Sequence, residues 1–110
     1  MNLELDFGDI KLRGKLFNNA IANQLKAELP LNIDLQQWGN EFYGSIDKDL
    51  GVENPQAEVS NNALAYTNHG NYFCIFFGQQ PAWPVEVVGE LQDSQRLKDT
   101  KSKVVEIKEA

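Results

Sequence analysis

The sequence has few of the residues that form covalent cross-links or metal sites. Its 110 residues include one cysteine, Cys74, and one histidine, His69. One cysteine excludes a disulfide within the chain, and such a composition is typical of proteins in a reducing compartment. One cysteine and one histidine alone cannot supply a structural zinc site, which takes four ligands. We therefore predict a cytoplasmic protein that holds no metal and no other cofactor.

Basic residues and long apolar runs are also scarce. Ten lysines and arginines face 16 aspartates and glutamates, a formal net charge of −6, which opposes binding to nucleic acid and to anionic membrane surfaces. The longest apolar run, Tyr72–Phe77, is far too short to span a bilayer. The first seven residues alternate apolar and polar or charged side chains and lack the apolar core of a signal peptide. We expect no nucleic acid or membrane partner, and a monomer or a weak homodimer.

What the sequence does contain is the composition of an ordinary globular domain. Hydrophobic residues make up 42% and charged residues 24% of the chain, and its length is that of one domain. We predict a single domain over residues 1–110.

Short alternating segments dominate the chain and predict β-strands. Leu3, Leu5 and Phe7 alternate with acidic residues, and a second alternating segment follows the Gly8-Asp9 turn signal, so residues 1–15 are predicted to form a hairpin. Further strands are expected over residues 31–36, 41–46, 63–66, 71–77, 85–91 and 103–108. Residues 47–61 are expected to form a long surface loop, with a possible short strand near 57–59.

One segment has the pattern of a helix. Ile21, Leu25 and Leu29 follow one another at a spacing of four, Asn18 or Asn19 can cap the start, and Pro30 ends the segment. We predict a helix over Asn19–Glu28 and one or two helical turns over residues 93–99. The predicted fold class is mainly β: a closed barrel of about eight strands with one long and one short helix, because closure removes exposed sheet edges.

The order of features over Ala63–Leu91 resembles the core of the cyclophilins. The segment reads ALAYTNHGNYFCIFFGQQPAWPVEVVGEL: a strand and a turn, an aromatic strand, a loop with a tryptophan, and a valine-rich strand with a glycine. The Trp38-Gly39 turn and the Phe76-Phe77-Gly78 strand end, followed by Pro81, are more similar to small prokaryotic proteins called cyclophilin-like, whose function is unassigned. The resemblance covers about residues 20–108. It implies a helix-capped, eight-stranded barrel with an outer groove, where cyclophilins hold an Xaa-Pro peptide.

The resemblance also indicates which residues would line such a groove. Asn68 and Gly70 match the groove turn of cyclophilins, and Trp83 resembles the groove tryptophan. On the aromatic strand, either Phe73 and Ile75 or Cys74 and Phe76 would face the groove, because a shift by one residue exchanges the two faces; we favour Phe73. The expected ligand-binding residues are Tyr43, Tyr66, Asn68, Phe73 and Trp83.

The arginine on which classical cyclophilin chemistry depends is missing. Its motif, Phe-His-Arg, follows the first helix in cyclophilins, but Arg13 and Arg96 both lie outside the matching region, residues 38–46. A fixed donor of this kind stabilises the twisted amide of the transition state. We therefore assign no catalytic residue and leave open whether the protein is an enzyme. The leading hypothesis is a non-classical binding module for a short peptide or small ligand, and the alternative is a weak or atypical peptidyl-prolyl cis-trans isomerase.

Several other side chains are of types that can take part in chemistry. Cys74 lies in the most apolar strand and is expected to be structural, and His69 is expected to be a turn residue. Glu41 or His69 in an unrelated hydrolase, and a partner-binding domain with no pocket chemistry, remain open alternatives. Glu41 and Glu86 could perform acid–base chemistry if both lined the groove. The acidic residues of the 47–61 loop lack the glycine position and flanking helices of a calcium loop.

Overall fold

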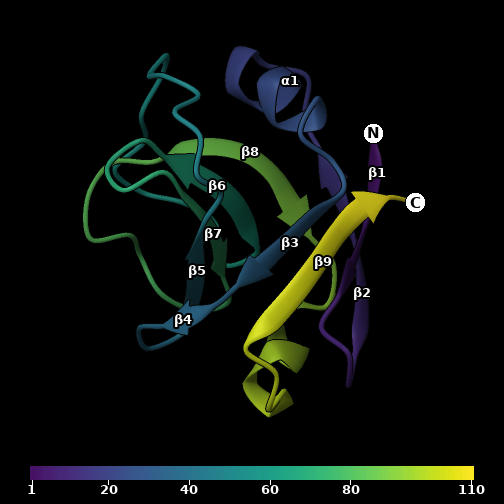
Figure 1. Ribbon diagram of the computed structural model, residues 1–110. Helices are drawn as coiled ribbons and strands as arrows, with labels where there is room; N and C mark the ends of the chain where they lie inside the picture. Colours follow the sequence, from purple (N-terminus) through teal and green to yellow (C-terminus); the bar gives the residue numbers. More distant parts are fainter.

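The computed structural model describes all residues 1–110 and contains nine strands and two helices (Figure 1). In chain order they are β1 (Asn2–Asp6), β2 (Lys11–Leu16), α1 (Ala20–Lys26), β3 (Leu31–Asp34), β4 (Gln36–Gln37), β5 (Glu41–Ser45), β6 (Ala63–Thr67), β7 (Tyr72–Phe76), β8 (Glu86–Leu91), the 3-10 helix η1 (Ser94–Asp99) and β9 (Val104–Glu109). Neither α1 nor η1 has the length and the apolar composition that a membrane-spanning helix needs.

The predicted N-terminal hairpin is present. Strands β1 and β2 pair antiparallel, with Leu5 opposite Leu12, and both leucines are buried. Gly8 allows the turn between them because it adopts a φ of +91°, which side chains disfavour. The other edge of β1 pairs with β9, so the two ends of the chain lie side by side (Figure 1).

The nine strands form one sheet that curls into a nearly closed barrel. Their order is β3-β9-β1-β2-β8-β6-β7-β5-β4. The strands at the two ends of this order, β3 and β4, are separated in the chain only by buried Leu35, whose N–H donates to the Lys103 carbonyl at 2.7 Å. The segment predicted as one strand over residues 31–36 is therefore two, because the chain bends at Leu35 to pass from one edge of the sheet to the other. This raises the strand number to nine.

The two helices cover opposite ends of the barrel (Figure 1). Helix α1 begins as predicted, since the Asn19 side chain accepts a hydrogen bond from the Ala22 N–H at 2.9 Å. Ile21, Ala22 and Leu25 are buried, and α1 contacts β8. The helix ends at Lys26, two residues before the predicted Glu28.

Strand β7 contributes side chains to two separate apolar clusters. Phe73 and Ile75 belong to the main cluster of 22 buried residues inside the barrel. Cys74 and Phe76 point to the other face and join a second cluster of five with Ala63, Ala65 and Val85. Two members of this second cluster, Cys74 and Val85, lie at the floor of an outer groove.

Several hydrogen bonds hold the long loop that follows β5 against the rest of the protein. The Tyr66 hydroxyl accepts a hydrogen bond from the Leu50 N–H at 2.8 Å. The Glu86 carboxylate accepts hydrogen bonds from the N–H groups of Glu53 and Asn54 at 3.0–3.1 Å. In place of a strand near residues 57–59, the loop forms a single bridge between Gln56 and Val85.

Candidate functional site

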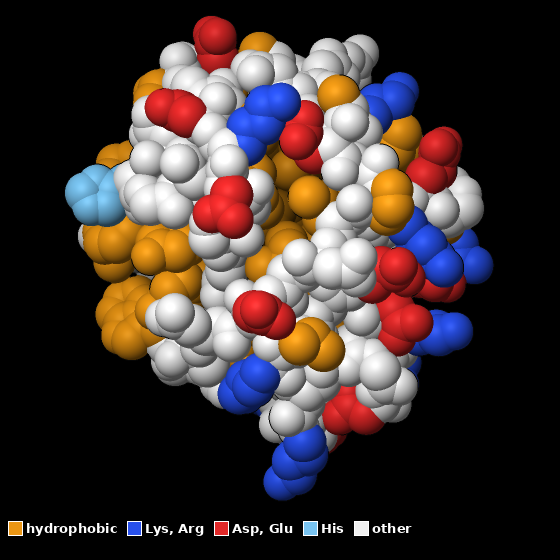
Figure 2. Space-filling view, in the orientation of Figure 1, with side chains coloured by type: hydrophobic (Ala, Val, Ile, Leu, Met, Phe, Trp, Pro, Cys, Tyr) orange, Lys and Arg blue, Asp and Glu red, His pale blue; other side chains and the backbone are white.

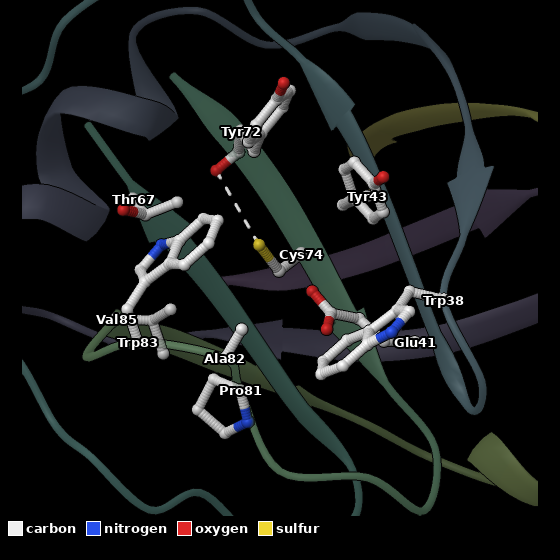
Figure 3. Close-up of a pocket in the computed structure, with 10 residues that line it drawn as sticks. All are labelled: Trp38, Glu41, Tyr43, Thr67, Tyr72, Cys74, Pro81, Ala82, Trp83 and Val85. Carbon is white, nitrogen blue, oxygen red and sulfur yellow. Dashed lines mark hydrogen bonds between the residues drawn. The ribbon is translucent and has the colours of Figure 1, made fainter. Parts of the chain in front are cut away.

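A groove of about 270 Å³ opens on the outer face of β5, β6 and β7 (Figure 3). Strand residues form its floor, and the loop before β8 and the turn before β5 form its walls. The residues that line it are Trp38, Glu41, Tyr43, Thr67, Tyr72, Cys74, Pro81, Ala82, Trp83 and Val85. Seven of these ten side chains are hydrophobic, so the groove can cover an apolar group.

Strand pairing fixes which side chains reach this groove. In β5 and β7, Tyr43 lies opposite Cys74, and both side chains point outward. Because side chains alternate between the two faces of a strand, Tyr72 also points outward, whereas Phe73 points into the barrel. Of the two possible registers of β7, the structure has the one in which Cys74 and Phe76 face outward, and not the one with Phe73 outward that we favoured.

Two exposed tryptophans stand on opposite sides of the groove (Figure 3). Trp38 is 51% exposed and Trp83 is 41% exposed. The Trp83 ring packs on the His69 ring with centroids 4.5 Å apart. Tyr43 and Tyr72, at one end of the same groove, pack edge to face with centroids 5.1 Å apart. Aromatic surface is thus concentrated around one opening.

A single carboxyl group lies among these rings. Glu41 is only 7% exposed, and its side chain forms no ion pair with a lysine, arginine or histidine. Burial raises the pKa of Glu41 from 4.5 to about 7, and a hydrogen bond with the neighbouring Cys74 thiol acts in the opposite direction. Near neutral pH this carboxyl therefore exchanges between its neutral and ionised forms.

Cys74 is a protonated thiol at neutral pH. Burial raises its pKa well above the ordinary value, and the adjacent Glu41 carboxyl raises it further. Its sulfur lies 4.0 Å from the Tyr72 carbonyl oxygen (Figure 3). Because the thiolate is the nucleophilic form, this environment favours the structural role expected from the sequence.

The structure places the five expected groove residues in three different settings. Tyr43 and Trp83 line the groove. Tyr66 and Phe73 do not: both are completely buried in the main core, since their side chains point into the barrel. Asn68 is exposed in the turn between β6 and β7 and is not part of the groove lining.

Two other residues that line the groove were not predicted to bind a ligand. From the sequence, Trp38 is expected only as part of a turn, and Glu41 only as an acid or base. Glu41 lies in a strand where a charged side chain normally points to water, but it is buried at the groove. Glu86, its suggested partner, binds the loop N–H groups elsewhere. No lysine, arginine or histidine lines the groove, so Arg13 and Arg96 both lie outside it.

Metal-ligating side chains do not gather anywhere in the structure. No group of three or more histidine, cysteine, aspartate or glutamate side chains is placed to hold a metal ion. The acidic residues of the loop after β5 thus form no such cluster.

Comparison with known proteins places this architecture in a family. A family model described as cyclophilin-like matches residues 1–108. Among solved structures, the hypothetical protein AF2241 from Archaeoglobus fulgidus superposes with a TM-score of 0.76 and 24% identity, over 100% of this chain and 95% of that one. McbB, solved in complex with tryptophan, gives a TM-score of 0.80 and 15% identity over 97% of this chain and 44% of McbB. No curated protein sequence matches the chain.

At these identities the two solved structures show a shared fold, and this chain spans less than half the length of McbB. The family model matches nearly every residue of the barrel and both walls of the groove. The protein belongs to the cyclophilin-like family.

Proposed function

We propose that the protein is a non-classical cyclophilin-like binding module, which holds a short peptide or a small ligand in the groove between Trp38 and Trp83. The observation that carries this proposal is the pair of exposed tryptophans on either side of an apolar floor. Tryptophan is a frequent anchor in binding sites, because one ring contributes a large contact area. Figure 2 shows hydrophobic side chains gathered beside the pale blue histidine at one edge of the molecule, and the ring of this histidine, His69, packs on Trp83.

The dimensions of the groove favour a small occupant. Its volume of about 270 Å³ is close to the lower end of ordinary ligand pockets, which span about 300–1,000 Å³. One aromatic or aliphatic group, free or as a side chain of a peptide, would fill it. McbB was solved in complex with tryptophan, which supports an aromatic ligand for a protein that contains a barrel of this fold.

The charge of the groove favours binding without prolyl isomerisation. Rotation about a prolyl bond faces a barrier of about 20 kcal/mol. A site that binds both isomers equally leaves that barrier unchanged, so catalysis needs a group that stabilises the twisted amide. No lysine or arginine lines the groove to do so. We therefore expect binding of an Xaa-Pro peptide to leave its isomerisation rate near the uncatalysed value.

The test is an NMR titration of the ¹⁵N-labelled protein with short Xaa-Pro peptides and with free aromatic amino acids. Exchange spectroscopy on the same peptide samples measures isomerisation. We expect saturable shifts at the amides of Tyr43, Cys74 and Trp83, and no exchange peaks beyond those of the peptide alone. Exchange peaks that need the protein would show that the isomerase alternative is correct.

A pair of variants tests whether the ligand binds in this groove. Trp83→Ala should weaken binding at least fivefold, because it removes one wall of the groove. Val104→Ala truncates another exposed apolar side chain, on β9 and outside the groove, and should leave affinity unchanged. Equal affinity of a folded Trp83→Ala variant and the unaltered protein would contradict the proposed location.

A further inference from the structure

The Glu41 carboxyl has no partner of opposite charge within the protein. The molecule's four ion pairs all lie elsewhere, at Lys11, Lys48 and Lys108. Glu41 nevertheless lines the groove while its residue is more than nine-tenths buried. A buried charge is unfavourable unless it is paired or hydrogen-bonded. Apart from the Cys74 thiol beside it, a weak donor, the protein offers this carboxyl no polar side-chain partner.

The rings around Glu41 are suited to the missing partner. Trp38, Tyr43, Tyr72 and Trp83 all line the same groove, and Figure 3 shows the Glu41 carboxyl between the two indoles. Aromatic faces carry partial negative charge and attract cations, most strongly where water is excluded. Aromatic walls and a carboxylate thus act on an ammonium group in the same direction.

We propose that the natural ligand of this groove is an organic amine, that is, a protonated ammonium group on an apolar body. This inference rests on the proposed function. The ammonium lies against the Glu41 carboxylate between the aromatic rings, and the apolar body covers the floor formed by Cys74 and Val85. Each ligand group then meets a surface of complementary chemistry.

The same arrangement discriminates against other ligands. An anion would be repelled by Glu41, and no lysine or arginine in the groove lining would compensate it. A neutral aromatic molecule would cover the floor and leave the carboxylate without a counter-ion. The net charge of −6 further favours approach of a cation. Discrimination therefore depends on the charge of the ligand more than on its shape.

Three probes of nearly the same shape test this inference: 2-phenylethylamine, 2-phenylethanol and phenylacetate. They are a cation, a neutral molecule and an anion at pH 8, where Glu41, with its pKa raised by burial to about 7, is mostly ionised. NMR titration gives each dissociation constant. We expect the amine to bind at least tenfold more tightly than the alcohol, and phenylacetate to bind most weakly. Equal affinity of the amine and the alcohol would overturn the inference.

A lysine side chain would present the same group from a peptide. N-acetyl-lysine methylamide and its uncharged Nζ-acetyl counterpart distinguish this source from a free amine. The charged lysine compound should bind more tightly than its acetylated counterpart, and the tighter of the two amines identifies the source.

The matched variants are Glu41→Gln and Glu90→Gln. The first keeps the size of the side chain in the groove and removes its charge, whereas the second removes an exposed charge on β8. Glu41→Gln should lower affinity for 2-phenylethylamine at least tenfold and change that for 2-phenylethanol less than twofold. Glu90→Gln should leave both unchanged. If Glu41→Gln does not fold, the comparison of the three probes on the unaltered protein still tests the inference.

The probes also separate this inference from the proposed function. If no probe and no peptide shifts the groove amides, the groove is not a binding site and both proposals fail. If the alcohol or phenylacetate binds there as tightly as the amine, the binding function stands and only the ammonium inference is wrong.

Discussion

Among single residues, Glu41 lies where the outer face of the barrel otherwise carries apolar and aromatic side chains. Its strand neighbours point either into the barrel, as Phe42 does, or into the groove, as Tyr43 does. Trp38 and the loop before β8 remove most of its contact with water, and its pKa rises for that reason. When Glu41 is ionised and no cation lies beside it, its buried charge therefore lowers the stability of the folded protein.

The first prediction follows from this shift. Because burial raises the pKa of Glu41 from 4.5 to about 7, its carboxyl is neutral in both the folded and the unfolded chain only well below pH 4.5. As pH rises towards 7 the unfolded chain ionises first, so stability falls. Relative to the unaltered protein, Glu41→Gln should gain stability between pH 4 and pH 8. The gain is at most about 3 kcal/mol, and less because the groove opens to solvent.

Urea denaturation of both proteins at several pH values measures this difference. The Glu90→Gln variant is the control, because its side chain is exposed. A stability difference between Glu41→Gln and the unaltered protein that does not change with pH would contradict the assigned environment.

Tyr66 provides a second prediction at the same scale. Its buried hydroxyl accepts from the Leu50 N–H, and it lies 3.0 Å from the Lys48 carbonyl oxygen and 2.9 Å from the Asn71 side-chain oxygen. Tyr66→Phe leaves the Leu50 N–H without its acceptor in a buried position. We expect a loss of about 1–3 kcal/mol in the free energy of unfolding.

Thermal or urea unfolding measures the loss, and Tyr43→Phe is the matched control because its hydroxyl forms no hydrogen bond within the protein. Similar small effects for the two variants would show that the loop is not held through Tyr66. Either way, Tyr66 acts inside the barrel and not in the groove.

At the scale of elements, closure of the barrel depends on how closely β3 approaches β5. Gly44 on β5 is buried against the Asp34 carbonyl and the Ile33 side chain, and a Cβ at Gly44 would overlap both. Strands β3 and β5, which share no backbone hydrogen bonds, can therefore lie in contact. A glycine at this position permits the contact because it has no side chain.

The third prediction concerns this contact. Gly44→Ala should lower the free energy of unfolding by at least about 2 kcal/mol, because β3 and β5 must separate to admit the methyl group. Ser45→Ala, at the next position and exposed, should change stability by less than about 1 kcal/mol. Denaturant unfolding of both variants provides the comparison, and equal stabilities would contradict close packing at Gly44.

The aromatic strand β7 shows why the register could not be inferred from its sequence. Tyr72–Phe76 is apolar on both faces, since the barrel interior covers one face and the groove walls partly cover the other. Alternation between apolar and polar residues, which indicates the buried face of an ordinary strand, is absent. Cross-strand pairing with β5 and β6 decides the register.

For the whole molecule, one core connects nearly all the elements. The main cluster takes residues from the N-terminal hairpin, from α1, from the central strands and from β9. An element that lost its place in this cluster would leave its neighbours exposed. Unfolding should therefore be cooperative, as is usual for domains of this size.

The fourth prediction tests this cooperativity. Fluorescence of Trp38 and Trp83 reports on the groove, whereas far-ultraviolet circular dichroism reports on all nine strands. The two signals should give the same urea midpoint, as expected when unfolding is all-or-none. A fluorescence midpoint clearly below the other would mean that the groove walls open before the barrel unfolds.

The sequence by itself determined the element types, the N-terminal hairpin, the start of α1 and the barrel class, because these depend on local alternation, capping and turn residues. The family resemblance also came from the order of short motifs along the chain. Only the tertiary structure decided the split of residues 31–37 into two strands, the direction of Phe73 and Tyr66, and the burial of Glu41. These depend on side chains far apart in sequence, and a strand with two covered faces carries no local sign of which face is which.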